Sequence, residues 1–312
     1  MKKIIIDCDP GHDDMMAIML AYASSDAVEL LGITTVAGNQ TGEKTFLNAL
    51  KVLTLLKAEN LPVARGFDRP LTRELTIAPE IHGVSGLDGA NLPEPGINGI
   101  EEHAVDFIIR TLMQAAEPLI LIPTGPLTNI GVALLKEPRI KKNIERIVLM
   151  GGAVYDSNIT PAAEFNIYVD PEAATIVFES GLPITMVGLD VTNKAMLTFE
   201  DISEIEKLAG PVSSVVAPLL RFFAQANCDI FNFQGAPLHD ALAVAAVIRP
   251  GIVKTSHLHV AVETAGKFTR GRTVTDVYGI LNLEPNVDVA LEVDVPRFKE
   301  MMIGAIRELD KR

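Results

Sequence analysis

Tryptophan is absent from the 312 residues of the chain, and cysteine occurs only twice, as Cys8 and Cys228. Two cysteines do not make the disulfide framework of a small secreted domain, so we expect a reducing, cytoplasmic setting. Positive charge is scarce as well, because 27 Lys and Arg stand against 40 Asp and Glu, which gives a net charge of −13. This balance argues against nucleic acid or an anionic membrane as a partner.

Long apolar runs are also missing. No stretch reaches the roughly 20 residues that cross a bilayer. The apolar run after Lys2 and Lys3 consists of three isoleucines, whereas the core of a signal peptide needs roughly 7–15 residues. Hydrophobic residues nevertheless make up 48% of the chain and charged residues 21%. We therefore expect a globular protein with a sizeable core that is not embedded in a membrane.

The chain alternates apolar, strand-like runs with segments of helical period. Strands are expected at 3–8, 28–37, 119–123, 146–150, 184–189, 258–262 and 288–293. Residues 101–116 and 296–309 place apolar side chains at i, i+3, i+4 and i+7, which predicts amphipathic helices. Alternating strands and helices predict parallel βαβ units, so the expected fold class is α/β with an open, mostly parallel sheet flanked by helices.

No linker and no internal repeat divides the chain, and we expect one domain over residues 1–312. Residues 60–100 are rich in proline and glycine and predict a long loop excursion. Loops of that length usually carry function. Residues 211–236 indicate a helical insertion.

Polar or glycine-rich clusters follow several of the expected strands: "DCDPGHDD", "VAGN", "IPTG", "LMGG" and "GLDVT". Ligands bind beyond the carboxyl ends of the strands in open parallel sheets. The residues expected to share this edge are Asp9, Asp13, Asp14, Asn39, Thr124 and Met150.

Four aspartates, Asp7, Asp9, Asp13 and Asp14, crowd the first of these clusters. A single aspartate would be explained by the stabilising effect of a negative charge at a helix N-terminus. Four of them repel one another at close range, and a bound cation removes that repulsion. Because the ligands are hard oxygens, Ca²⁺ or Mg²⁺ is favoured. Zinc is disfavoured, since one cysteine and one histidine do not complete a zinc site.

Two further segments contain polar residues of interest. In "GAPLHDALAVAAVI", His239 and Asp240 precede an apolar helical run, and a helix cap at Asp240 explains them equally well. In "TPAAEFNIYVDPEAA", Glu164 and Asn166 lie two residues apart, so on an extended segment they would point the same way. Taken alone, this second segment is better interpreted as a solvated loop.

Seven segments, in order along the chain, resemble the inosine–uridine-preferring nucleoside hydrolase family. They are "DCDPGHDD", "AGNQT", "IHGVSGLDG", "PTGPLTNI", "VLMGGA", "PAAEFNIYVDPEAA" and "PLHDA". The resemblance spans essentially the whole chain, and the motifs look most like those of bacterial pyrimidine-preferring ribonucleoside hydrolases. It implies an open α/β fold with a Rossmann-like core, usually as a homotetramer or dimer, that hydrolyses the N-glycosidic bond of ribonucleosides.

The resemblance also implies roles for individual residues. Ca²⁺ would be bound by Asp9, Asp14, the backbone carbonyl of Thr124 and Asp240, and Asp9 would be the general base toward a calcium-bound water. The residues that would bind the ribose are Asp13, Asn39, Met150 (through its backbone), Glu164, Asn166 and Asp240. His82 and His239 would lie near the leaving base, and His239 is a candidate for its acid.

Such residue types suit the chemistry that the resemblance implies. Cleavage at C1′ builds positive charge on the ribosyl group, as in other glycosyl hydrolyses. Carboxylates stabilise that charge more than they stabilise a neutral substrate, which is what catalysis requires. Acceptance of the 2′- and 3′-hydroxyls by Asp13 and its neighbours would select ribose over deoxyribose.

The sequence departs from its relatives around the base. Purine-specific relatives stack the base between tryptophans, which this chain lacks. Pyrimidine-preferring relatives carry a glutamine and a tyrosine in the helical insertion, where this chain has Asn227 and Phe231, so a hydroxyl is lost. Phe165 is expected either to wall the base pocket or to belong to the core. We expect a pyrimidine preference, for uridine or cytidine, with broad inosine and uridine specificity as the alternative.

Two other classes of protein are open at this point. A phosphohydrolase with an aspartate nucleophile would fit the "DCD" strand end, but no lysine or arginine between Ile4 and Glu43 would face the phosphate. A non-catalytic nucleoside- or sugar-binding protein with a structural calcium is not excluded by any residue.

Overall fold

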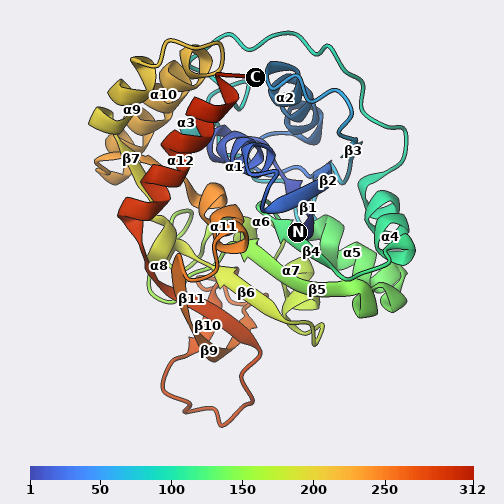
Figure 1. Cartoon of the computed structure of the whole chain (residues 1–312). Coiled ribbons are helices and arrows are strands. Elements are labelled where there is room, and N and C mark those ends of the chain that lie inside the picture. Colours follow the sequence, from blue (N-terminus) through green and yellow to red (C-terminus); the bar gives the residue numbers. More distant parts are fainter.

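In the computed structural model of the chain, which describes residues 1–312, one nine-stranded sheet forms the centre (Figure 1). The strand order is β10-β9-β11-β6-β5-β4-β1-β2-β3. The strands are β1 (Lys2–Cys8), β2 (Val28–Thr35), β3 (Val63–Arg65), β4 (Leu119–Pro123), β5 (Ile144–Met150), β6 (Ile184–Val187), β9 (Val253–Val262), β10 (Thr273–Asp276) and β11 (Val287–Val293). Every pairing is parallel except those of β9 with β10 and β11. The expected open, mostly parallel sheet is confirmed.

Helices cover both faces of this sheet (Figure 1). One face packs against α1 (His12–Ala23), α2 (Gly42–Leu55), α10 (Ser213–Phe231), α11 (His239–Ile248) and α12 (Val295–Leu309). The other face packs against α4 (Ala104–Gln114), α5 (Thr128–Lys136) and α7 (Pro171–Phe178). The remaining elements are short: α3 (Pro79–His82), the 3₁₀-helix η1 (Pro138–Asn143), α6 (Phe165–Val169), α8 (Leu189–Thr192), α9 (Phe199–Glu206) and the strand pair β7 (Met196–Thr198) and β8 (Gly235–Pro237).

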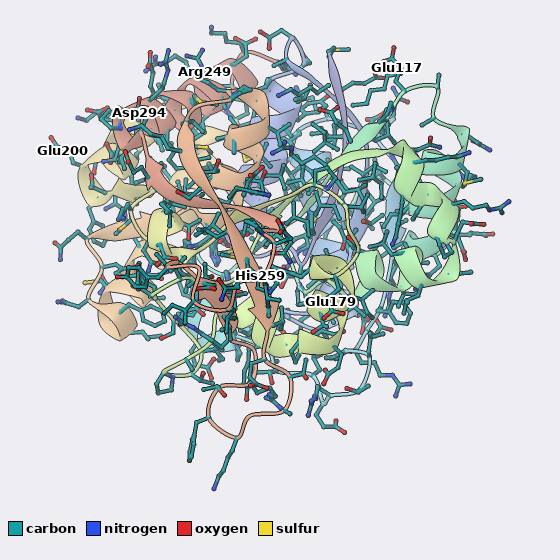
Figure 2. All side chains as sticks on the ribbon, turned by 90° about the horizontal axis from the view of Figure 1, so that it is seen from below. Glu117, Glu179, Glu200, Arg249, His259 and Asp294 are labelled. Atoms are coloured by element: carbon teal, nitrogen blue, oxygen red, sulfur yellow. The ribbon has the colours of Figure 1, made fainter.

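The three isoleucines of β1 show why its sequence is apolar throughout. Ile4 and Ile6 belong to the core on the α1 side, whereas Ile5 belongs to the core on the α5 side. A strand buried on both faces needs a continuous apolar run instead of an alternating one. Charged side chains such as Glu117, Glu200 and Arg249 lie at the outer boundary of the molecule (Figure 2).

Most expected elements are present, with shifted ends. β4 spans the predicted residues, and β2 and β6 each end two residues earlier than predicted. β9 begins at Val253, five residues before the predicted start, because its first half is polar and exposed. β3, β7, β8 and β10 were not predicted, since strands of three or four residues are too short to show a period.

The two unusual segments of the sequence have different structures. Within 60–100, only β3 and the single turn of α3 are regular, and the chain then continues to α4 (Figure 1). Within 211–236, α10 runs from Ser213 to Phe231 and ends at Asn232, whose φ of 58° is left-handed. None of the helices is both long and apolar enough to cross a bilayer.

Phe298 tests how far α12 contributes to the core. Its side chain is fully buried in the core, and α12 packs against α1 and α11. Phe298→Ala should therefore lower the free energy of unfolding by about 3–5 kcal/mol. The matched control is Phe268→Ala, because Phe268 is 76% exposed and should change stability by less than about 0.5 kcal/mol. Urea unfolding followed by circular dichroism measures both, and equal effects would contradict the packing of α12.

Candidate active site

A cavity of about 270 Å³ lies at the carboxyl edge of the sheet. Of the fourteen residues that the sequence singled out, the cavity is lined by Asp13, Asn39, His82, Thr124, Met150, Glu164, Phe165, Asn166, Asn227, Phe231, His239 and Asp240. The other two, Asp9 and Asp14, are fully buried and form hydrogen bonds to the lining residues Asn39 and Thr124. The structure thus brings all fourteen into one place.

Neighbouring strands explain this convergence. Asp9 follows β1, Asn39 follows β2, Thr124 follows β4 and Met150 ends β5, and these four strands are adjacent in the sheet. The turn after Asp9 leads directly into the first turn of α1, which carries Asp13 and Asp14. The polar strand ends therefore meet at one edge, as the sequence predicted.

Asp14 is the best satisfied of the clustered acids. One of its oxygens accepts hydrogen bonds from Thr124 Oγ1 at 2.9 Å and from the Asp9 backbone N–H at 3.3 Å. The other accepts from the Gly11 N–H at 3.0 Å and from Asn39 Nδ2 at 3.1 Å. Part of the role of Asp14 is thus to cap the N-terminus of α1.

Asp9 and Asp13 are less completely bonded. Asp9 Oδ2 accepts a hydrogen bond from the Asn39 N–H at 2.6 Å, but Asp9 Oδ1 and Asp13 Oδ1 are buried without any hydrogen-bond partner. A buried carboxylate oxygen without a partner is costly. Asp7 Oδ2 is likewise buried without a partner, but among these three residues Asp13 alone lines the cavity, where its oxygen can meet a ligand.

The electrostatics of the cluster favour a positive ligand. Burial, and then repulsion by Asp14, raises the pKa of Asp13 to about 8 and that of Asp9 well above its usual value. Burial, and then Asp13, does the same to the pKa of Asp240. No lysine or arginine forms an ion pair with these acids or with Asp14. Full ionisation of the cluster needs a cation.

The oxygen atoms are arranged suitably for such a cation. One carboxylate oxygen from each of Asp13, Asp14 and Asp240 lies within 4.8 Å of the others. Asp13, which the resemblance assigned to the ribose, is in this group, and Asp9, which it assigned to the metal, is not. The Thr124 carbonyl accepts a hydrogen bond from Asn166 Nδ2 at 2.7 Å. A set of buried oxygens without nitrogen or sulfur fits Ca²⁺ or Mg²⁺.

Asp7 does not belong to the cluster. Its Oδ1 accepts hydrogen bonds from Thr34 Oγ1 at 2.5 Å and from Asn129 Nδ2 at 2.8 Å, and burial raises its pKa to about 7. The first motif therefore contributes three acids to the site, and Asp240 is the fourth.

Glu164 and Asn166 reach the cavity by a route that the sequence did not predict. The segment is not extended, because Glu164 caps α6 and accepts hydrogen bonds from the N–H groups of Asn166 and Ile167. Asn166 lies in the first turn, and its Nδ2 donates to the carbonyls of Thr124 and Met150. Both side chains line the cavity because α6 begins at its edge.

One face of α10 forms part of the cavity wall. Phe223, Asn227 and Phe231 follow one another at intervals of four, which places them on one side of the helix. Asn227 Nδ2 donates to the Phe223 carbonyl at 2.9 Å, which leaves Oδ1 and the second N–H of the amide for a ligand. Phe223 was not predicted, although the helical spacing from the two predicted residues could have indicated it.

His82 is held by His12, whose role the sequence analysis also missed. His82 ends α3 and is buried, and its Nδ1 lies 3.3 Å from the His12 backbone nitrogen. The His12 ring donates from Nε2 to the Asp88 carbonyl at 2.8 Å and stacks against Phe223. Burial lowers the pKa of His12 to about 4 and that of His82 well below its usual value. The position of His12 within "DCDPGHDD" is the feature of the sequence that could have indicated this role.

His239 is the first residue of α11, and its Nδ1 lies 2.8 Å from Thr192 Oγ1. Burial lowers its pKa to about 4, so the ring is neutral at pH 7. Further lining residues outside the quoted motifs are Ile77, Ala78, Glu80, Asn158, Ile159 and Ile230, and Ile81, the first residue of "IHGVSGLDG", also lines the cavity.

The fold and the cavity define an α/β enzyme whose site is lined with acids and prepared for a cation. The family model described as inosine-uridine preferring nucleoside hydrolase matches residues 4–300, and the chain belongs to this family. It is accordingly an N-ribosyl hydrolase, which cleaves the N-glycosidic bond of ribonucleosides.

The names of individual relatives specify different nucleobases. The chain is 49% identical over 300 residues to the pyrimidine-specific ribonucleoside hydrolase RihA of Salmonella paratyphi B, covering 96% of each chain. Its identity to RihA of Escherichia coli O139:H28 is 48% over 305 residues, which covers 97% of this chain and 98% of the relative. The solved purine-preferring ribonucleoside hydrolase from Gardnerella vaginalis is 37% identical with a TM-score of 0.92, covering 99% of each chain.

Gly125 tests the placement of Asp9. A Cβ at Gly125 would come within 2.5 Å of Asp9 Oδ1, so Gly125→Ala should displace the carboxylate and reduce kcat by about tenfold to a hundredfold, because small misplacements of catalytic groups are costly. Gly304→Ala is the control, since its Cβ would meet open space. Steady-state ribose release and far-UV circular dichroism measure activity and fold, and full activity of Gly125→Ala would contradict the placement.

Proposed function

We propose that the chain is a Ca²⁺-dependent ribonucleoside hydrolase that prefers pyrimidine nucleosides, uridine and cytidine, and acts in cytoplasmic salvage. The observation that supports it most is the group of buried acids at the cavity, in which Asp9 Oδ1 and Asp13 Oδ1 lack partners. Buried carboxylates without partners destabilise the folded protein. A bound cation would offset their charge, and sugar hydroxyls would donate hydrogen bonds to them.

The metal would be held by the carboxylates of Asp14, Asp240 and Asp9 and by the Thr124 carbonyl, with Asp13 beside them. When bound, Ca²⁺ would supply a Lewis acid that polarises water and orients the ribose hydroxyls. Calcium is proposed over magnesium because it accepts six to eight oxygens in a flexible arrangement that includes carbonyls.

Asp9 is proposed as the general base. The hydrogen bond from the Asn39 N–H fixes Oδ2, and Oδ1 is left without a partner to accept a proton. A positioned base of this kind contributes about 10²–10⁴-fold to a rate.

The ribose would be bound by Asp13, Asn39, the Met150 backbone, Glu164, Asn166 and Asp240. Asp13 Oδ1 has no hydrogen-bond partner and would accept a hydrogen bond from a sugar hydroxyl. Carboxylates around the sugar would stabilise the positive charge that develops as the bond to the base breaks.

The base would lie between His82, His239 and the lining face of α10. Phe165 and Phe231 would contact its faces, and Asn227 Oδ1 would accept a hydrogen bond from it. The 49% identity to a pyrimidine-specific enzyme supports the pyrimidine preference. Broad inosine and uridine specificity is the second candidate, because the purine-preferring relative has the same fold.

We also propose that residues 1–312 work as one catalytic unit, because the cavity uses residues from Asp13 to Asp240. A homo-oligomer, with a tetramer favoured, would cover the exposed apolar side chains after β10, namely Tyr278, Ile280, Leu281 and Leu283.

The substrate and the metal are tested together. Uridine, cytidine, inosine and 2′-deoxyuridine are each incubated with the enzyme, with Ca²⁺ or with a chelator, and the released reducing sugar, ribose or 2-deoxyribose, is measured. We expect the highest kcat/KM for uridine or cytidine, a loss of at least about a hundredfold for the deoxy sugar because its partner acids stay unpaired, and no turnover with chelator. Inosine as the best substrate would favour the second candidate, and binding of uridine without cleavage would favour a binding protein.

Asp9 and Asp240 should separate catalysis from metal binding. Asp9→Asn should reduce kcat by about 10²–10⁴-fold, since it removes the base, while the Kd for uridine changes much less. Asp240→Ala removes a metal ligand outright, whereas Asp9→Asn keeps an oxygen that can still bind the metal. Asp240→Ala should therefore lose activity and also the rise in Tm that Ca²⁺ gives the wild type, because a ligand that binds only the folded state stabilises it. Differential scanning fluorimetry and stopped assays measure both, and near-normal kcat in Asp9→Asn would overturn the role of Asp9.

A further inference from the structure

Residues 263–273 connect β9 to β10 and include Thr273, the first residue of β10. This connection lies at the end of the sheet farthest from β3 in strand order (Figure 1). We call residues 263–273 the hairpin brace. No residue of the brace lines the cavity. The brace nevertheless contacts both irregular segments that contribute cavity residues, 66–82 and 151–163.

The first contact fixes the segment 151–163, which joins β5 to α6 and places Asn158 and Ile159 at the cavity. Arg272 donates from Nη1 to the carbonyls of Asp156 at 3.3 Å and Ala162 at 3.2 Å. Its Nη2 donates to the Val154 carbonyl. One guanidinium therefore bridges backbone positions at both ends of a loop that has no hydrogen-bonded ladder of its own.

Thr273 adds a second contact to the same segment. Its buried hydroxyl accepts a hydrogen bond from the Ala153 N–H at 2.9 Å and donates to the Ala153 carbonyl at 2.7 Å. The start of β10 thus fixes the point where the segment leaves β5.

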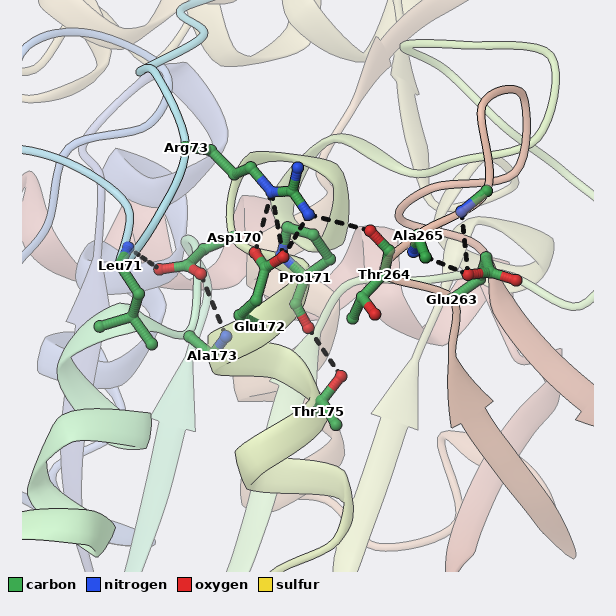
Figure 3. A network of polar contacts seen from close by, with 11 residues as sticks. Leu71, Arg73, Asp170, Pro171, Glu172, Ala173, Thr175, Glu263, Thr264 and Ala265 are labelled. Atoms are coloured by element: carbon green, nitrogen blue, oxygen red, sulfur yellow. Dashed lines mark hydrogen bonds and ion pairs between the residues drawn. The ribbon is translucent and has the colours of Figure 1, made fainter.

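The second contact fixes the segment 66–82, which carries Ile77, Ala78, Ile81 and His82 to the cavity. Arg73 pairs with Glu172 of α7 through Nε and Nη2, and its Nη2 also donates to the Thr264 carbonyl of the brace at 2.9 Å (Figure 3). Close by, the Leu71 N–H donates to Asp170 Oδ2 at 2.9 Å (Figure 3). Arg73 therefore ties this segment to α7 and to the brace at once.

We propose that the hairpin brace positions the substrate-binding walls of the active site, with Arg272 setting the segment 151–163 and Arg73 setting the segment 66–82. The planar guanidinium of arginine fixes the direction of several acceptors together, which a flexible ammonium does less well. Neither arginine lines the cavity, so both act through the residues that they position. The proposal rests on the proposed function, because it takes the cavity to be the nucleoside site.

Arg272→Met and Arg73→Met test the brace kinetically. Each should raise the KM for uridine by about tenfold, because a wall displaced by about an ångström binds substrate poorly, while kcat stays within about threefold. Arg146→Met is the matched control: Arg146 donates to Thr185 at 2.8 Å and pairs with Asp288 at 3.0 Å across β5, β6 and β11. The Arg146→Met variant loses the same kind of contacts at a place away from both segments. The KM of this variant for uridine should therefore stay at the wild-type value.

Hydrogen–deuterium exchange supplies a readout that does not depend on the substrate. Arg272→Met should raise exchange in 151–163 and not in 66–82, Arg73→Met should do the reverse, and Arg146→Met should do neither. In Arg272→Lys the KM should lie between those of Arg272→Met and the wild type, because the ammonium still donates to some of the three carbonyls. Arg272→Lys also serves as the test if Arg272→Met does not fold.

The results separate the brace from the proposed function. A wild type that releases no ribose from any nucleoside would contradict the proposed function, while segment-specific exchange would still support the brace. Folded Arg272 and Arg73 variants with wild-type KM and wild-type exchange in an active enzyme would overturn the brace. An equal rise of KM in Arg146→Met would overturn it too, because a general loss of stability would then explain the effect.

Discussion

Repulsion between buried carboxylates is the constraint on which the rest of this molecule depends. Asp9, Asp13, Asp14 and Asp240 converge beside the end of β1, where burial makes their negative charges expensive. Hydrogen bonds satisfy Asp14 but leave one oxygen of Asp9 and one of Asp13 without a partner. The apolar packing of β1 on both faces holds this arrangement in place. The same repulsion favours a cation at this site, where one carboxylate oxygen from each of Asp13, Asp14 and Asp240 lies within 4.8 Å of the others.

The site combines a rigid part with an adjustable part. Asp9, Asn39, Thr124 and Met150 stand at the ends of adjacent parallel strands, so the sheet fixes their spacing. The walls come from α10 and from two irregular segments that depend on side-chain contacts for their conformation. The two relatives whose names specify different bases, one pyrimidine-specific and one purine-preferring, each match nearly the whole chain.

The sequence indicated a large share of both fold and site, and the reasons are local. Apolar runs ending in polar clusters located most long strands, and helical period located α4 and α12. The order of the family motifs gathered residues that the structure places around one cavity. Short strands such as β3 and β7 escaped notice because three residues carry no period. Asn158 and Ile159 escaped because nothing in their local sequence marks a residue that lines a cavity.

By itself, the sequence determined that acids would collect at the carboxyl end of the first strand, because that depends only on neighbours in the chain. Only the tertiary structure decided which acids reach the cavity: Asp7 Oδ1 accepts hydrogen bonds from Thr34 and Asn129 and the residue does not line the cavity, whereas Asp13 does. It also set His12 against His82, and Arg272 against the loop after β5. Such contacts join residues tens to more than a hundred positions apart, and the packing of the whole sheet and its helices determines which of them meet.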